Sequence, residues 1–121
     1  MLRMTERPVG DVMILDLHGT LSPGVAEVNL GDKVRSILYS GYRKLLLNLA
    51  NMTSTDSSAV SALVGALLAA REVRAEIKLV NVMTRLKDVL IIAALHSYFT
   101  IFDSEDDALE SFRPTGQAQA V

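Results

Sequence analysis

Short apolar runs alternate with helically periodic segments along most of this chain, and the alternation restricts the folds that it can adopt. Strands are predicted at Met1–Val9, Val12–Leu17, Lys44–Leu49, Glu76–Asn81 and Phe99–Asp103. Helices are predicted from Gly24 to Gly41, from Asp56 onward, over Thr84–Leu95 and over Ser104–Phe112. This order predicts an α/β fold, with a mostly parallel sheet of four to five strands, an antiparallel N-terminal edge and about four helices.

Local signals agree with this order. The pair Gly10-Asp11 suits a tight hairpin turn between the first two strands. The nearly continuous apolar run Lys44–Leu49 is typical of a strand that is covered on both faces. Ser104 is followed by three acidic residues, which indicates a helix start, because the hydroxyl can cap free amides and carboxylates suit the helix dipole.

Composition restricts the classes of function. The 121 residues carry 12 basic and 14 acidic side chains, a net charge of −2, and no cysteine. We expect one domain over 1–112 and a disordered tail over 113–121. The missing thiols exclude disulfide frameworks and thiol catalysis, and the slightly acidic balance argues against nucleic acid as a partner. Uncharged stretches are too short for a membrane span and the start lacks a signal-peptide pattern, so a cytoplasmic location is expected.

The second predicted helix has two contrasting faces. At about 100° per residue its larger apolar side chains form one stripe that we expect to face the core: Val60, Leu63, Val64, Leu67 and Leu68. The opposite face carries only small, uncharged residues: Ser58, Ala62, Gly65, Ala66 and Ala69. Such a face favours close contact, either with another helix of the same domain or with another protein. The sequence leaves both alternatives open.

A polar turn precedes this helix. The segment Thr53–Ser58 places six hydroxyl or carboxyl side chains in a row where a strand passes into a helix. One interpretation is a capping cluster that satisfies the free amides of the first helical turn. The other is a phosphorylation switch, because a helix N-terminus tolerates phosphate and the added charge would transform a neutral docking face. The two interpretations are compatible.

These residues carry a resemblance to a known family. Leu47-Asn48-Leu49, the Ser/Thr-rich turn and the run Asp56–Leu63 are similar to the signature of the STAS domain. Leu15–Leu21 resembles the family's early strand with its glycine turn, Glu76–Asn81 its next strand, and Tyr98–Leu109 its end. The resemblance covers roughly residues 9 to 112. The chain departs from the family pattern at Ser22, Asn48 and Ala59, where the family often has aspartate, aspartate and glycine.

The nearest kind within that family is the single-domain anti-sigma-factor antagonist. The resemblance implies binding to an anti-sigma factor with serine kinase activity, release on phosphorylation of Ser57, with Ser58 as the second choice, and recovery through a PP2C-type phosphatase. The partner-binding residues implied are Ser22, Asp56, Ser58, Ala59, Ala62, Gly65, Ala66 and Ala69.

An alternative function shares the fold. The chain could be a constitutive STAS subunit of a stress-signalling scaffold or of a lipid-transport complex, without a phosphorylation switch, and self-association is a further option. Catalysis is not expected, because Ser57 lacks the setting of a nucleophile elbow and His18 and His96 have simpler roles at a turn and a helix end. No cofactor or metal site is expected, since acidic residues cluster only at a helix start and no phosphate-binding glycine loop is present.

Overall fold

A computed structural model describes residues 2–19, 25–53 and 57–113. In chain order, the elements are β1 (Leu2–Val9), β2 (Val12–Gly19), α1 (Val25–Tyr39), β3 (Lys44–Met52), α2 (Ser57–Glu72), β4 (Glu76–Val80), α3 (Thr84–Ile92), the 3₁₀ turn η1 (His96–Tyr98), β5 (Thr100–Phe102) and α4 (Glu105–Ser111). The predicted α/β class, the five strands and the four helices are confirmed. Nearly all of the tail expected over 113–121 lies outside the described residues.

The five strands form one sheet in the order of the sequence, β1-β2-β3-β4-β5. β1 and β2 are antiparallel and every later pair is parallel, as the sequence predicted. Each new parallel strand is added on the same side of the last one. Right-handed crossovers then bring all the connecting helices to one face of the sheet.

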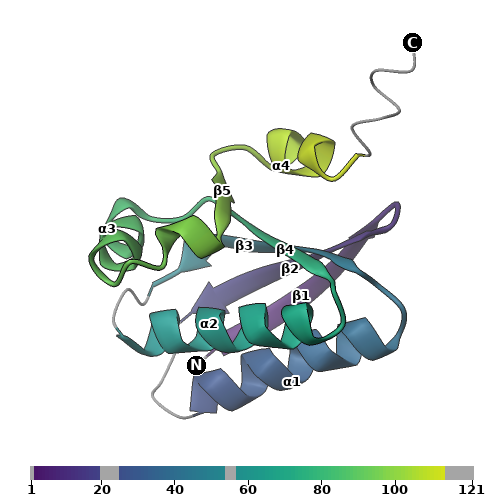
Figure 1. The fold of residues 1–121 in the computed structure, drawn as a ribbon, viewed down its shortest axis with the longest axis horizontal. Coiled ribbons are helices and arrows are strands. Elements are labelled where there is room, and N and C mark those ends of the chain that lie inside the picture. The colour runs from purple at the N-terminus through teal and green to yellow at the C-terminus, as the bar shows by residue number, and fades with distance from the viewer. Residues whose placement is uncertain (1, 20–24, 54–56, 114–121) are drawn as a thin grey trace.

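That face carries the main core. Alternate strand residues such as Leu15, Leu47 and Leu79 pack there with residues of α1, α2 and α3. Figure 1 shows α1 and α2 side by side along this face of the sheet. The strands place their other residues on the opposite face, where α4 covers a smaller cluster. That second cluster consists of Val12, Ile14, Leu46, Val80, Ala108 and Phe112.

The third helix is shorter than predicted. It ends at Ile92, because Ala94 adopts a positive φ of 59° and its amide donates to the carbonyl of Ile91. The amide of Leu95 then donates to the carbonyl of Leu90, which completes a Schellman helix end. Alanine is unusual at this left-handed position, so the glycine signal that marks such ends in a sequence is missing.

Candidate functional site

The candidate phosphorylation segment follows β3 at the sheet edge where β2 and β3 have their carboxyl ends. The amide of Thr53, just after β3, donates to the carbonyl of Gly19 at the end of β2 at 2.9 Å. Ser57 is the first residue of α2, so the predicted phosphoacceptor stands at a helix N-terminus. Ser22 and Asp56 lie outside the described residues, as do the side chains of Ser57 and Ser58.

Three of the five residues on the small face of α2 lie in an internal contact, and their assignment to a docking surface is wrong. Ala62, Ala66 and Ala69 are buried in the main core, where α2 packs beside α1. Small side chains let the two helices approach closely. The methyl group of Ala59 is buried in the same core, so Ala59 is no partner contact either. Of the small residues expected to bind a partner, only Gly65 is described as partly exposed.

The predicted core stripe of α2 is rotated accordingly. Leu63 and Leu67 are buried, whereas Val60 and Val64 are only partly so and Leu68 is 55% exposed. The buried face of α2 is rotated because the helix packs against both the sheet and α1. Its buried arc therefore centres on the alanines rather than on the larger side chains.

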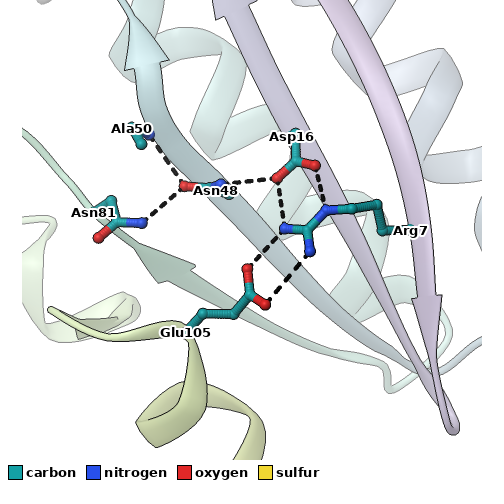
Figure 2. A network of polar contacts seen from close by, with 6 residues as sticks. All are labelled: Arg7, Asp16, Asn48, Ala50, Asn81 and Glu105. Atoms are coloured by element: carbon teal, nitrogen blue, oxygen red, sulfur yellow. Dashed lines mark hydrogen bonds and ion pairs between the residues drawn. The ribbon is translucent and has the colours of Figure 1, made fainter.

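A network of polar side chains crosses the sheet face that α4 only partly covers (Figure 2). Arg7 of β1 donates from Nε to Asp16 Oδ2 at 2.5 Å and from Nη2 to Asp16 Oδ1 at 2.9 Å. The same guanidinium donates to Glu105 at the start of α4, with Nη2 to Oε1 at 2.7 Å. One cation thus joins the edge strand, its neighbour and the last helix.

Two amides extend the network toward the edge where the loops meet. Asn48 of β3 donates from Nδ2 to Asp16 Oδ1 at 2.8 Å. Its Oδ1 accepts from the amide of Ala50 at 3.1 Å and from Asn81 Nδ2 at 3.0 Å. Asn81 has a positive φ of 60° where β4 leads into α3, and this bond fixes its side chain. The network therefore reaches from α4 to the β4–α3 connection.

Asp16 is the one buried charged or polar residue in the described part of the chain, and its surroundings stabilise the ionised form. The hydrogen bonds from Arg7 lower the pKa of Asp16 most, burial opposes them, and the amide of Asn48 lowers the pKa further. In return, Asp16 and Glu105 raise the pKa of Arg7 above its already high value. The guanidinium thus keeps its charge throughout the accessible pH range.

The amide at position 48, a departure from the family pattern, fits this network. An aspartate in place of Asn48 would lose the donor to Asp16 and set a second carboxylate beside it. We expect Asn48→Asp to lower the free energy of unfolding by about 1–2 kcal/mol near neutral pH. The loss shrinks on acidification, because the like charge raises one carboxyl pKa and protonation then relieves the repulsion.

Urea unfolding at neutral pH and at about pH 4, where carboxyl groups titrate, measures the loss of unfolding free energy. The matched control is Asn51→Asp, which makes the same change at an exposed position of the same strand. We expect the control to shift stability by less than about 0.5 kcal/mol. Equal stability of Asn48→Asp and the wild type at both pH values would contradict a stabilising hydrogen bond from the Asn48 amide to Asp16.

Sequence reasoning missed Arg7, Asp16 and Glu105. A signal for the first two was present, since Asp16 interrupts an apolar strand and the hairpin register pairs Thr5 with Asp16 and Arg7 with Ile14. Residues 5, 7, 14 and 16 then share one face, with the guanidinium diagonal to the carboxylate. Glu105 could not be found in this way, because its place depends on how α4 packs.

The described residues also bear on metal binding, membrane spans and the places of the two histidines. In the described ranges, no group of three or more His, Asp or Glu side chains could hold a metal ion. None of the helices described there is long and apolar enough to cross a membrane. His18, predicted at a turn, lies on strand β2. His96, predicted at the end of a helix, opens the turn η1 after α3 has ended at Ile92.

The fold and this arrangement define a small α/β domain with a loop-to-helix junction at the carboxyl edge of its sheet. A family profile for the STAS domain matches residues 4–108, and the chain belongs to that family. No curated protein sequence matches the chain significantly.

Solved structures give the same fold. A Thermotoga maritima protein assigned as an anti-sigma factor antagonist has a TM-score of 0.81 at 25% identity, covering 92% of this chain and 95% of its own. SpoIIAA from Bacillus in its phosphorylated form has a TM-score of 0.70 at 18% identity, covering 92% and 100%. RsbS from Moorella thermoacetica has a TM-score of 0.77 at 13% identity, covering 97% and 98%.

Proposed function

We propose that this chain is an anti-sigma-factor antagonist that acts by partner switching. The observation that carries the proposal is the position of Ser57, the first residue of α2, directly after β3 and its loop. Membership of the STAS family and the 25% identity to the Thermotoga maritima protein support it. In this role the unphosphorylated chain binds an anti-sigma factor with serine kinase activity, and phosphorylation of Ser57 releases it. Ser58 is the second candidate.

The switch would be electrostatic. A phosphate adds a charge of about −1.5 to −2, and the amides and dipole at the start of α2 tolerate it without unfolding the helix. Asp56 precedes Ser57, so the new charge would add to a carboxylate instead of being neutralised. A partner that docks over this edge would then meet like charge, and a few kcal/mol of lost interaction changes affinity by orders of magnitude.

The partner surface we propose contains Ser57. It includes Ser22, Asp56 and Ser58 together with Gly65, which is partly exposed on the outer side of α2. The buried alanines of α2 take no part in it. A PP2C-type phosphatase would restore the binding form, and the chain itself acts as a cytoplasmic regulator and kinase substrate, not as an enzyme. No cofactor is required for such a mechanism.

Affinity purification from the native cell with Ser57→Ala and Ser57→Asp baits tests the proposal. We expect the Ala bait to retain an ATP-binding anti-sigma factor and the Asp bait to retain at least about tenfold less of it, because the added carboxylate stands where the phosphate charge would be. Mass spectrometry of the retained proteins measures the ratio.

Ser36→Asp is the matched control, since it adds the same charge at an exposed position on the neighbouring helix α1. We expect this control to bind as the wild type does. If the Ala and Asp baits retain one complex equally, the switch is wrong. The constitutive subunit of a signalling scaffold or a lipid-transport complex then becomes the better account.

A further inference from the structure

A pocket of about 240 Å³ lies between the ends of α1 and α2, at the opposite end of α2 from Ser57. Its apolar lining comes from Leu38, Ala69 and Val73, and Tyr39 stands at its rim with 89% of its surface exposed. No large apolar side chain in the described part of the chain is more exposed than Tyr39. The exposed ring and the apolar hollow beside it together give a partner side chain apolar surface to cover.

Gly41 lines the pocket where α1 ends. Its φ of +110° strongly favours glycine, and a methyl group built on it would meet no atom within 4 Å. The turn that ends α1 therefore favours glycine at this point of the lining.

Arg43 supplies a fixed cation at the same place. Its Nη1 donates to the carbonyl oxygens of Leu38 and Tyr42, both at 2.8 Å, which fixes the guanidinium at the end of α1. Arg35 also lines the pocket, and its carboxylate partner Asp32 is exposed and 3.8 Å away, a pair of little energetic value. Glu72 is the one acidic residue in the lining, so two positive charges oppose one negative charge.

The volume decides what kind of occupant fits. Pockets for small molecules usually measure about 300–1,000 Å³, and this one is smaller. A single large apolar side chain fits a space of this size, and such buried anchors dominate the energetics of protein interfaces. A guanidinium with its orientation fixed is suited to recognise a carboxylate next to the anchor.

We propose that this pocket docks a segment of a partner protein in which an apolar or aromatic anchor side chain stands beside an acidic residue. The anchor fills the space between Leu38, Ala69 and Val73 and packs on Tyr39. The carboxylate pairs with the guanidinium of Arg43, which is held at the carbonyl of Leu38 near the end of α1.

The surface is separate from the phosphorylation edge. The 16 residues of α2 span about 24 Å, with Ser57 at one end and the pocket at the other. A partner on the pocket would leave the start of α2 accessible, so the chain could hold two proteins at once. This inference does not depend on the function proposed for Ser57.

Selection from a library of random dodecapeptides displayed on phage, with the full chain as bait, tests the proposal. We expect enriched peptides to combine Phe, Leu, Ile or Trp with Asp or Glu within one or two residues. Titration of a synthetic enriched peptide into the ¹⁵N-labelled chain should shift the amide signals of Gly41, Ala69 and Val73 and leave those at the start of α2 unchanged.

Two variants and a control sharpen the result. Arg43→Gln should weaken the peptide at least about tenfold, and Tyr39→Ala should weaken it without affecting the fold, because that ring is exposed. Arg74→Gln, an exposed arginine outside the pocket lining, should bind as the wild type does. The proposal would be overturned if no peptide or only basic peptides were enriched. It would also be overturned if both variants bound the peptide as the wild type does, or if only signals near Ser57 moved.

Discussion

Ala66→Lys is expected to unfold the domain or bring it close to unfolding, whereas Gly65→Lys one residue earlier leaves it folded. Ala66 is fully buried where α2 meets α1 and the sheet, so a lysine there would place an ammonium group in the core without a partner. The cost is on the order of 4 kcal/mol or more, a large part of the stability of a domain of this size. We therefore expect the melting temperature to fall by on the order of 15 °C or more.

Gly65 supplies the matched control. It is partly exposed, and a Cβ added to it would meet no atom within 4 Å, so the lysine can extend into solvent. Removing a glycine from a helix interior favours the helix by roughly 1 kcal/mol, which should hold the melting temperature at or slightly above that of the wild type. Thermal unfolding followed by circular dichroism measures both variants. A stable Ala66→Lys variant would contradict the packing of α1 against α2.

The fold was largely predictable from the sequence because its signals are local. Strand-like runs, helical periodicity and the Gly10-Asp11 turn each depend on neighbouring residues, and the parallel order follows from the alternation. The end of α3 was predicted less well, since Ala94 adopts a backbone conformation that usually requires glycine. Its left-handed φ accompanies the hydrogen bonds from the amides of Ala94 and Leu95 to the carbonyls of Ile91 and Leu90.

The faces of α2 were harder to predict for a different reason. A helical wheel shows which residues lie together but not how many neighbours the helix will have. Here α2 contacts both the sheet and α1, so the buried arc includes Ala62, Ala66 and Ala69 and leaves Leu68 outside. The network of Arg7, Asp16 and Glu105 joins residues up to 98 positions apart. Its contact between Arg7 and Glu105 forms only when α4 packs on the sheet.

Replacing Arg7 with methionine is expected to lower the free energy of unfolding near neutral pH, by an amount that shrinks in acid. The side chain of Asp16 is 11% exposed, so without the guanidinium its charge would be nearly buried, with the amide of Asn48 as its one hydrogen-bond donor among the described residues. Loss of one partner of a fully buried pair costs roughly 3–5 kcal/mol. Because the Arg7 side chain is 40% exposed, we expect about 2 kcal/mol after discounting for solvent.

The pKa of Asp16 determines whether the unfolding free energy rises or falls with pH at this site. In the wild type that pKa lies below its unfolded value, so the stabilisation is complete above about pH 4 and is lost as the pH falls through the folded pKa. In Arg7→Met the strongest cause of the lowering is gone and burial instead raises the pKa of Asp16. Protonation then relieves the buried charge, so at this site acidification favours the folded variant.

Urea unfolding of the wild type and of Arg7→Met, measured as a function of pH, tests this expectation. The difference in unfolding free energy between wild type and Arg7→Met should be largest near neutral pH and should narrow as the pH falls through the carboxyl range. Asp11→Asn is the control, because the pKa of Asp11 is also lowered, by Lys44, but this pair lies on the surface. We expect it to change stability by less than about 1 kcal/mol. If the Arg7→Met difference stays constant with pH, Arg7 stabilises the fold by packing, and the ion pair with Asp16 adds nothing to it.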